Sequence, residues 1–437
     1  MHHSLWEISD KTPDFPQFEG TTSTDVLIIG GGLCGILCAY YLQKADINYI
    51  LVEKNRIFDG TSKNSTGKIT SQHGLIYSKI TKLYGAEMAS MYLHANENAV
   101  KTYAKLCRDI DCDFERKEAY IYSTASRKSI EKETDAVNRL GLNVRFVQNT
   151  ELPFEISGSI CFENQAQFNP YKFAAAVAKG LNIYENTFVH ELTPTAAYIG
   201  NGCIKAEKFI VATHFPFVNL YGAYFLKLYQ HRSYMASYNN TPVINGMYAD
   251  ENLNGLSLRS YQNSLIVGGS GHRTGKNSKA WNGLNQFVSR YYPGAVAEYR
   301  WAAQDCMSLD SIPYIGRYSD SLPNVYVASG FNKWGITSSM VAAQLLTDMV
   351  RDKENQFAPV FSPQRKMHLP GLMANAFEST LNMLTPTTRR CPHMGCALKW
   401  NKAEHTWDCS CHGSRFSRQG SLLENPAIRD ADIDDEE

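Results

Sequence analysis

Near the C-terminus, cysteine and histidine occur in two short loops whose spacing suits a metal site. The loops read Cys391-Pro-His393-Met-Gly-Cys396 and Cys409-Ser-Cys411-His412-Gly-Ser414. One Cys–His pair from each loop could together hold zinc in a tetrahedral site. Such a site would leave Cys396 and Cys411 without a role, and these two take matching places in the two loops. The residues therefore predict a metal centre, and zinc is one candidate.

A mixed set of sulfur and nitrogen ligands is also typical of a Rieske centre. There, two thiolates hold one iron of a [2Fe–2S] cluster and two imidazoles hold the other. Both loops resemble those of the Rieske ferredoxin and cytochrome bc family. The resemblance implies four cluster ligands, namely Cys391, His393, Cys409 and His412. It also implies a loop-clamping disulfide between Cys396 and Cys411. Because such a cluster carries single electrons, the rest of the chain should supply chemistry that needs electrons moved.

The N-terminal part has a glycine-rich turn between a predicted strand and a predicted helix. Residues 25–29 are apolar and rich in β-branched side chains, which favours a buried strand. In the turn, Gly30 permits a tight bend, Gly32 lets backbone approach a pyrophosphate and Gly35 lets helix and strand pack closely. A second predicted strand ends at Glu53, which is placed to accept hydrogen bonds from a ribose. The pattern predicts a dinucleotide site.

The segment after Glu53 indicates which dinucleotide to expect. Residues 60–67 resemble the G-x-S-x-x-S-x-G segment that covers FAD in the glycine oxidase, sarcosine oxidase and D-amino-acid oxidase superfamily. An ordinary surface loop is the alternative for this segment taken alone. Two later motifs share the resemblance: a strand ending in Ala-Thr before His214, and a strand–glycine–helix unit over residues 324–335. The resemblance implies FAD, bound by Gly30, Gly32, Gly35, Glu53, Thr61, Ser62, Thr66, Gly67, Ala212, Thr213, Gly330 and Gly335.

These motifs imply three folded parts. We expect an α/β FAD-binding Rossmann-like domain, an α+β substrate domain and a small all-β Rieske domain. An N-terminal arm (1–22) precedes the oxidoreductase domain (23–350), a linker with one short helix follows (351–364), and the Rieske domain covers 365–437. Within 23–350, the FAD part is expected at about 23–75, 160–225 and 300–350, and the substrate part at about 75–160 and 225–300. The last Rieske strand should be short or missing, and the acidic tail from Asp430 should be disordered.

Length, charge and hydropathy limit the partners and the compartment. At 437 residues the chain should contain two or three domains. Its 43 basic and 43 acidic residues give a formal net charge of zero, so neither nucleic acid nor an acidic membrane surface is expected as a partner. The N-terminus lacks the apolar stretch of a signal peptide. The longest apolar run, residues 26–42, is interrupted by four glycines, which argues against a transmembrane segment. A cytoplasmic location is the expectation.

The expected function is a flavin dehydrogenase that oxidises a small organic substrate. Electrons would then leave FAD through the cluster to a one-electron protein partner or a quinone, or enter by the same route. An NAD(P)H-dependent reductase would need a second dinucleotide fold, which the sequence does not offer. A Rieske oxygenase would need a separate iron site of two histidines and a carboxylate. A redox sensor or electron-transfer module without catalysis stays open as the alternative.

The catalytic residues are the least specified part of the sequence. His73, His214 and His272 are candidates to line the flavin cavity, although a single histidine is more often a packed or surface residue than a catalytic base. In amino-acid-oxidising relatives, an arginine five residues before the aspartate of a D-x-x-P-x-I-G motif binds the substrate carboxylate. That aspartate is Asp310 here, and the position five residues earlier is Asp305. An acid cannot hold a carboxylate, so Asp305 indicates an amine substrate or has a structural role.

Overall fold

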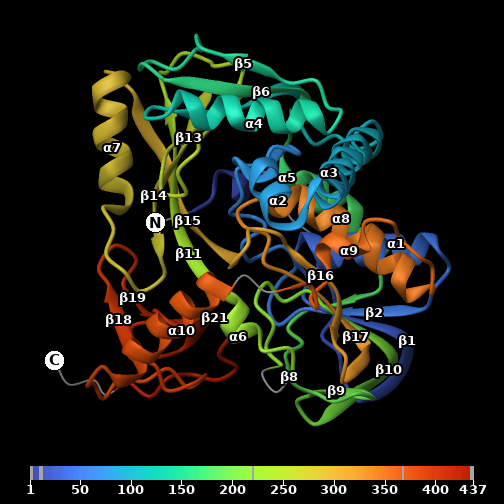
Figure 1. Cartoon of the computed structure of the whole chain (residues 1–437). Coiled ribbons are helices and arrows are strands. Elements are labelled where there is room, and N and C mark those ends of the chain that lie inside the picture. The colour runs from blue at the N-terminus through green and yellow to red at the C-terminus, as the bar shows by residue number, and fades with distance from the viewer. Residues whose placement is uncertain (1–2, 9–12, 219–220, 367–368, 434–437) are drawn as a thin grey trace.

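The computed structural model of the chain describes residues 3–8, 13–218, 221–366 and 369–433. Three β-sheets form its framework, and helices pack on the two larger sheets (Figure 1). The first sheet contains, in order, β16 (Tyr314–Ser319), β17 (Leu322–Ser329), β10 (Gly202–Val211), β1 (Thr21–Ile29), β2 (Tyr49–Val52) and β7 (Ile183–Tyr184). Two further strands, β8 (Val189–Leu192) and β9 (Ala196–Ile199), extend it beside β10.

Strand β1 lies at the centre of the first sheet and pairs in parallel with β2 and β10. Its last residues are apolar because both faces of this sheet are covered. Val26 and Ile28 enter the core that contains α1 (Leu33–Lys44) and α8 (Gly335–Val350), whereas Leu27 and Ile29 enter a second core on the opposite face. The predicted strand–turn–helix unit is therefore present, and the carboxyl end of β1 opens toward the glycine turn.

The second sheet is mixed and contains nine strands. Its order is β15 (Val296–Ser308), β11 (Leu228–Asn239), β14 (Ser264–Arg273), β13 (Ser257–Tyr261), β12 (Met247–Asp250), β4 (Glu115–Ser123), β6 (Gly158–Gln167) and β3 (Lys68–Ile69), and β5 (Arg145–Val147) pairs with β6. The helices of this part are α2 (Ile76–Tyr84), α3 (Ala86–Leu106), α4 (Arg127–Arg139) and α7 (Ala280–Tyr291). Strands β6 and β15 lie largely in ranges that the sequence analysis gave to the FAD part. Both strands belong instead to the second sheet, because β15 pairs with β11 and β6 pairs with β4. A local sequence pattern does not specify which strands will pair.

The C-terminal part is a four-stranded antiparallel sheet preceded by a long helix. Its strands are β18 (Leu398–Asn401), β19 (Thr406–Cys409), β20 (Arg415–Phe416) and β21 (Leu422–Glu424). The remaining helices are the 3-10 helix η1 (Leu5–Ile8), α5 (Pro170–Ala178), α6 (Tyr224–Lys227), α9 (Ala358–Phe361) and α10 (Leu369–Leu384). Helix α10 lies beside α6 at the border between this sheet and the rest of the molecule (Figure 1).

The end of the chain is more ordered than its composition predicts. The short last strand is present as β21, and Leu422 N donates a hydrogen bond to Asp430 Oδ1 (2.8 Å). Ala431 is buried and its N–H donates to the carbonyl of Gly420 (2.9 Å). The first residues of the acidic tail are thus held by the sheet, and residues 434–437 lie outside the described part. Within the described ranges, no helix combines the length and the apolar character needed to cross a bilayer.

Candidate functional site

A cavity of about 1070 Å³ opens at the carboxyl end of β1. Eleven of the twelve predicted FAD residues line it, and Gly35 is the exception. Gly35 instead lies inside the first turn of α1, where a Cβ atom would come within 1.9 Å of the carbonyl oxygen of Gly30. Its role is to let helix and turn approach each other, as the glycine pattern predicts.

Glu53 is fixed at the edge of this cavity by backbone hydrogen bonds. Its Oε2 accepts from Gly31 N (2.7 Å) and its Oε1 accepts from Asn55 N (2.9 Å). Burial raises the pKa of the carboxyl, and the two N–H donors lower it. The carboxylate therefore faces the glycine turn.

The polar segment 60–67 folds over the same turn. Ser62 Oγ accepts a hydrogen bond from Leu33 N (3.0 Å), at the start of α1, and a Cβ on Gly32 would come within 3.3 Å of that oxygen. Thr61 Oγ1 donates to the carbonyl of Gln304 (3.0 Å) on β15. A helix N-terminus, a glycine turn and a hydroxyl-rich cover thus surround one space, which fits the phosphates of a dinucleotide.

The structure places two of the three candidate histidines, His73 and His214, at the cavity and the third, His272, elsewhere. His73 lines the cavity but is 5% exposed, and both ring nitrogens are occupied: Nδ1 lies 2.7 Å from Tyr92 Oη, and Nε2 lies 2.9 Å from Thr337 Oγ1. Burial lowers its pKa to about 3, so the ring is neutral. His272 does not line the cavity; it stacks on Tyr234 (ring centroids 5.8 Å apart), and as a cavity residue it is a wrong prediction. Its ring is held elsewhere, with Nε2 3.3 Å from Tyr234 Oη and Nδ1 2.9 Å from the carbonyl of Arg273.

His214 and Asp305 do meet in the cavity, together with a lysine that the sequence analysis did not single out. His214 Nε2 lies 3.1 Å from Gln230 Oε1, and burial lowers the pKa of the ring. Burial raises the pKa of Asp305, and the nearby Lys333, His214 and Arg232 lower it. Burial in turn lowers the pKa of Lys333 to about 8 although Asp305 raises it, and Lys333 Nζ donates to the carbonyl of Leu253 (2.7 Å).

The two Cys–His loops form similar turns. In the first, Cys391 N donates to the carbonyl of Cys396 (2.8 Å) and Gly395 N donates to that of Cys391 (2.9 Å). In the second, Cys409 N donates to the carbonyl of Ser414 (2.9 Å) and Gly413 N donates to that of Cys409 (2.9 Å). Superposing the turns matches Cys396 with Ser414, so the matching places predicted for Cys396 and Cys411 are wrong. The disulfide joins unlike positions of two like turns.

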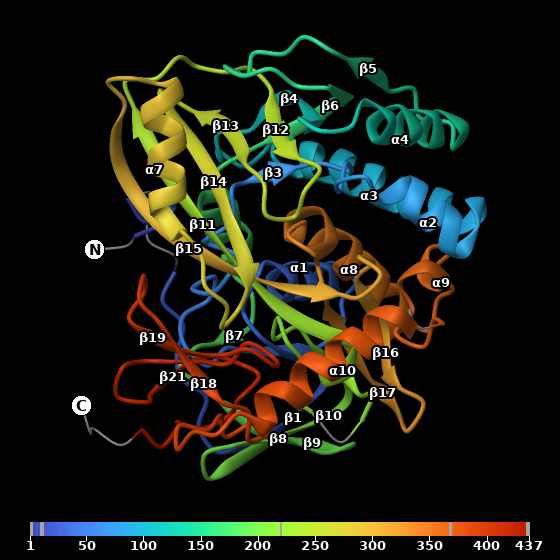
Figure 2. The ribbon, with the colours of Figure 1, turned by 60° about the vertical axis from the view of Figure 1, so that its left-hand side comes forward.

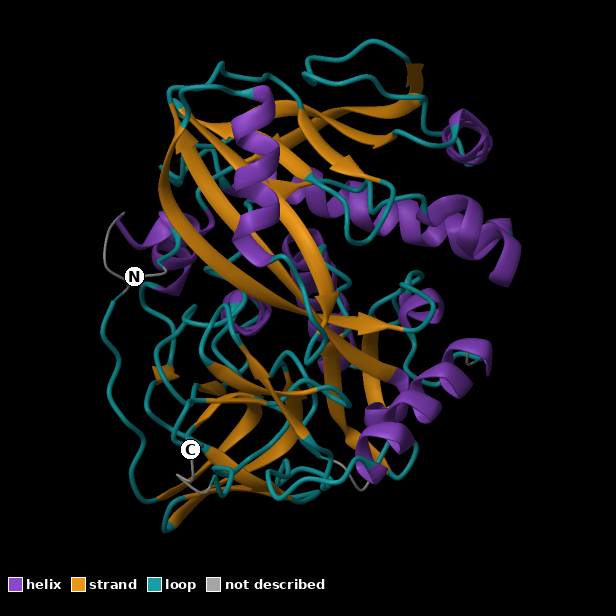
Figure 3. Cartoon of the chain, turned by 90° about the vertical axis from the view of Figure 1, so that its left-hand side faces the viewer, coloured by secondary structure: helices purple, strands orange, loops and turns teal. Residues whose placement is uncertain are grey.

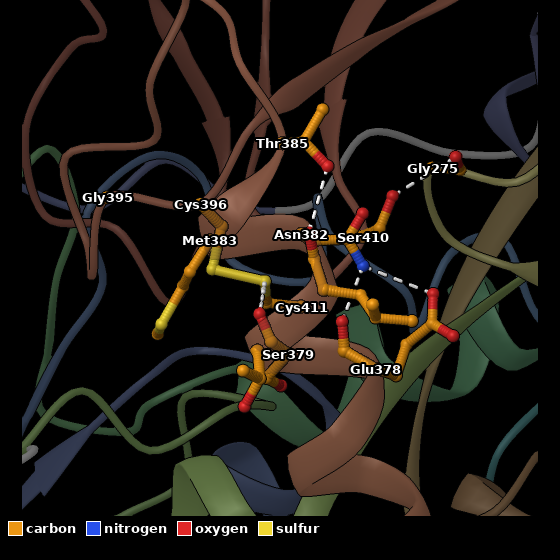
Figure 4. The surroundings of a disulfide bond; sticks show 12 residues. Gly275, Glu378, Ser379, Asn382, Met383, Thr385, Gly395, Cys396, Ser410 and Cys411 are labelled. Atoms are coloured by element: carbon orange, nitrogen blue, oxygen red, sulfur yellow. Dashed lines mark hydrogen bonds between the residues drawn. A yellow bond between two sulfur atoms is a disulfide. The ribbon is translucent and has the colours of Figure 1, made fainter.

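The side chains of the two loops converge. The thiols of Cys391 and Cys409 lie within hydrogen-bonding reach of each other, and the rings of His393 and His412 are 4.9 Å apart (centroids). Burial lowers the pKa of His393 to about 4 and that of His412 to about 3, so both rings are neutral, the form that binds metal. A disulfide joins Cys396 and Cys411 (Figure 4). Because that bond consumes two of the four thiols, two thiols and two imidazoles are left, which is the set that a Rieske cluster takes.

The second loop is in direct contact with residues of the cavity. Gln304, which lines the cavity, donates through Nε2 to the carbonyl of Gly413 (2.8 Å). Gly413 has φ +85°, and a Cβ there would come within 2.2 Å of the Gln230 side chain, so this position requires glycine. The ring of His412 faces the aromatic rings of Phe215 (6.4 Å) and Phe225 (6.1 Å).

The C-terminal sheet also forms one wall of the cavity, which the sequence analysis missed. Residues of the segment from Leu422 to Ile428 line it, and Asn425 Nδ2 donates to the carbonyls of Thr213 and Phe215 (2.7 Å each). No local signal could have revealed this wall. Lys333, by contrast, stands two residues before Gly335 in the strand–glycine–helix unit, where its place could have been noticed.

Comparisons with known proteins agree with this architecture. Residues 25–349 match the family model "FAD dependent oxidoreductase" (DAO), and residues 377–433 match "Rieske [2Fe-2S] domain". The Rieske 2Fe-2S iron–sulfur protein YhfW of Bacillus subtilis (strain 168) is 33% identical over 98% of this chain and 96% of its own length. Gamma-glutamylputrescine oxidoreductase of Escherichia coli (strain K12) is 21% identical over 80% of this chain and 88% of its own.

The fold resembles that of solved oxidases. Glycine oxidase from Geobacillus kaustophilus superposes with a TM-score of 0.67 at 19% identity, covering 80% of this chain and 100% of that one. The predicted fold class and both predicted cofactors, FAD and a [2Fe–2S] cluster, are confirmed by the two family matches. The chain belongs to the DAO family of FAD-dependent oxidoreductases and carries a C-terminal Rieske [2Fe-2S] domain.

Proposed function

We propose that this chain is a flavin-dependent dehydrogenase that oxidises a small amine and passes the electrons from its FAD to its cluster. When bound, FAD accepts two electrons from an organic substrate, and the [2Fe–2S] cluster carries one at a time. The cluster ligands proposed are Cys391, His393, Cys409 and His412. The proposed FAD contacts are the cavity-lining residues described above, with Glu53 on the ribose.

The observation that carries this proposal is the hydrogen bond from Gln304 to Gly413. Gln304 is joined through its own carbonyl to Thr61 in the FAD-covering segment and through its amide to the second ligand loop. A continuous path of covalent and hydrogen bonds therefore runs from the cavity to the second Cys–His loop. Fusion in one chain also keeps the two centres at a high effective concentration.

An amine substrate is supported by Asp305. Its carboxylate faces the cavity, and no hydrogen bond or ion pair reaches it from the residues that the structure describes. A substrate ammonium group could pair with it there. His214 lies nearby as a proton acceptor: if Nε2 donates to Gln230 Oε1, Nδ1 is left unprotonated, and the lowered pKa keeps the ring neutral. The similarity to gamma-glutamylputrescine oxidoreductase agrees with an amine.

Electron transfer can be tested before the substrate is known. The flavin of the holoprotein would be photoreduced without oxygen, and the reduced cluster would be followed by EPR. We expect the cluster signal to grow as the flavin signal falls, and Gln304→Leu to slow that exchange at unchanged flavin and iron content. A cluster that stays oxidised beside reduced flavin would contradict the proposal.

The substrate class needs a separate test. A panel of primary and secondary amines would be screened anaerobically for flavin bleaching, with the matching carboxylic acids as controls. Asp305→Asn should raise the KM for amines more than it lowers kcat, because it removes a charge that binds the ground state and the transition state alike. Equal bleaching by the carboxylic acids would refute the role of Asp305.

A further inference from the structure

Helix α10 has its polar face turned inward and its apolar face turned outward. The buried side chains include Asn375 (2% exposed), Ser379 (7%) and Asn382 (3%). The exposed ones are Met373 (72%), Phe377 (65%), Leu381 (50%) and Leu384 (75%). This is the reverse of the usual pattern, in which the apolar stripe of a surface helix faces the core.

The inward face is polar because it caps backbone groups of neighbouring elements. Asn375 Nδ2 donates to the carbonyls of Leu226 (2.9 Å) and Leu228 (3.1 Å), and Asn375 Oδ1 accepts from Arg273 (2.6 Å). The carbonyl of Asn382 accepts from Ala397 N (3.1 Å), next to the disulfide. Figure 4 shows Ser379 and Asn382 on the side of the helix that faces this disulfide. The orientation of α10 is thus fixed by hydrogen bonds, and its outward face is a consequence of them.

The outward face forms one apolar stripe. The four exposed residues recur at intervals of four, four and three, which places them along one side of a helix. In the described part of the chain, twelve large apolar side chains are exposed, and these four share one helix while the other eight are scattered over other elements. Helix α10 lies at the periphery of the molecule in two views (Figures 2 and 3). A clustered apolar surface of this kind marks a binding site rather than chance exposure.

Basic residues flank α10 at both ends. From residue 355 to residue 403 the sequence holds six basic residues and one acid, Glu378, and one of the six, Arg365, is buried and paired with Asp310. Glu378 forms an ion pair with Lys276, and Lys399 lies near enough for both charges to affect its pKa. Exposed Lys366 precedes the helix, and partly exposed Arg389 and Arg390 follow it. The zero net charge of the whole chain therefore hides a local excess of cations.

We propose that α10 docks on an anionic lipid bilayer surface, with its apolar stripe in the headgroup region and the cations around it against the lipid phosphates. A stripe of Phe, Leu and Met on a helix with basic flanks is the combination that binds such interfaces. A protein partner or a second copy would account for the apolar stripe, but an anionic bilayer also accounts for the basic residues at both ends of the helix. The proposal departs from the expectation from net charge, which named no acidic membrane surface as a partner.

Docking would bring the cluster to the membrane. Arg390 Nη1 donates to the carbonyls of Met383 (2.7 Å) and Gly395 (3.0 Å), so the end of α10 and the first ligand loop are tied together. His393 in that loop is partly exposed, whereas His412 is buried against the oxidoreductase domain. Docking would leave His412 packed against the oxidoreductase domain, and the partly exposed His393 in the loop that is tied to the docked helix. This inference goes beyond the proposed function and does not depend on which substrate is oxidised.

Flotation of the purified holoprotein with vesicles tests the inference. Vesicles of phosphatidylcholine with added phosphatidylglycerol would be compared with pure phosphatidylcholine. We expect flotation with the anionic vesicles, weakened by salt. The double variant Phe377→Gln/Leu384→Gln should lower the partition coefficient at least about tenfold, which is about 1.4 kcal/mol. The matched control is Val243→Gln/Val296→Gln, which changes two exposed valines outside α10 and should float like the wild type.

Each other outcome would overturn the inference. All four positions lie outside the flavin and cluster residues, so equal flavin and iron contents will show that both variants are folded. If the α10 variant floats as well as the wild type, the apolar stripe is not the membrane-binding surface. If the protein floats equally well with both vesicle types, binding does not require anionic lipid. If the wild type instead fails to float and forms a concentration-dependent dimer in sedimentation equilibrium, and the α10 variant loses that dimer, the apolar stripe binds a second copy of the chain and not a membrane.

Discussion

A buried ion-pair network joins the oxidoreductase domain to the Rieske domain. Replacing Arg232, its arginine on β11, tests how much this network stabilises the contact between the two domains. Arg232 is 5% exposed in its side chain and donates to both carboxylate oxygens of Glu404, one at 2.9 Å, and to Glu424 at 3.0 Å. Arg415 of the Rieske domain shares both glutamates. Replacing Arg232 with methionine keeps most of the volume and removes the charge.

Two lines of reasoning give the magnitude. Removing one partner of a buried pair leaves an uncompensated charge and costs about 3–5 kcal/mol. Independently, burial raises the pKa of Glu404, but Arg232 and Arg415 outweigh it and hold that pKa at about 2, against an ordinary value of 4.5. A difference of that size corresponds to about 3 kcal/mol, shared between the two arginines. We therefore expect Arg232→Met to destabilise the docked domain by about 2–3 kcal/mol.

The assay is urea unfolding followed by the visible circular dichroism of the cluster, which reports on the Rieske domain even if the whole chain does not unfold in two states. With a slope of about 1–3 kcal/mol per M, the midpoint should fall by about 1–3 M. Arg290→Met, at an exposed position on α7, is the matched control and should leave the midpoint unchanged. Adding Glu404→Gln to Arg232→Met should restore part of the loss, because without Arg232 the two glutamates would otherwise have to share Arg415.

The pH dependence has a definite sign. Because the folded pKa of Glu404 is depressed, its stabilising contribution is present above pH 4.5 and is lost as the pH falls toward about 2. The gap between wild type and Arg232→Met should therefore narrow across that window. A midpoint for Arg232→Met equal to that of Arg290→Met at neutral pH would refute the reasoning.

Three further outcomes are expected. Glu53→Ala should weaken FAD binding by about 1.5–3 kcal/mol, the worth of charge-assisted hydrogen bonds, and leave the cluster intact; unchanged flavin occupancy after dialysis would count against it. Phe416→Tyr should raise the cluster midpoint in an EPR redox titration, because a hydroxyl would join Ser414, which lies within reach of Cys391, as a donor to the cluster, and an unchanged midpoint would disprove this. Metal analysis should find about two irons with acid-labile sulfide and one FAD per chain; zinc without sulfide would remove the Rieske assignment.

The sequence was most informative where function depends on a few neighbouring residues. The glycine turn after β1 and the two Cys–His loops were predicted with their cofactors, because close backbone approach and metal binding each require particular residue types at short spacing. A Cβ at Gly35 would collide with Gly30 whatever the rest of the fold. Such constraints act within a turn or two, so they are legible without tertiary structure.

The sequence did not show which sheet a strand would join or toward which side a side chain would point. β6 and β15 lie largely in ranges that the sequence analysis gave to the FAD part, and only their hydrogen-bond partners assign them to the second sheet. His272 and His214 both lie on loops or strand ends near the expected cavity, but only His214 reaches it. Pleat and register decide this, and a shift of one residue reverses the face that a side chain takes.

Tertiary structure alone decided how the two redox parts meet. Gln304 and Gly413 are far apart in sequence, and nothing near either residue signals their hydrogen bond. The same holds for the inward Asn375, whose partners on α6 and β11 turn the apolar side of α10 outward. Local sequence determines which backbone turns and ligand sets can form. Contacts between distant segments depend on how whole sheets and helices pack, because the free energy that selects them is distributed over many residues and none of them carries it alone.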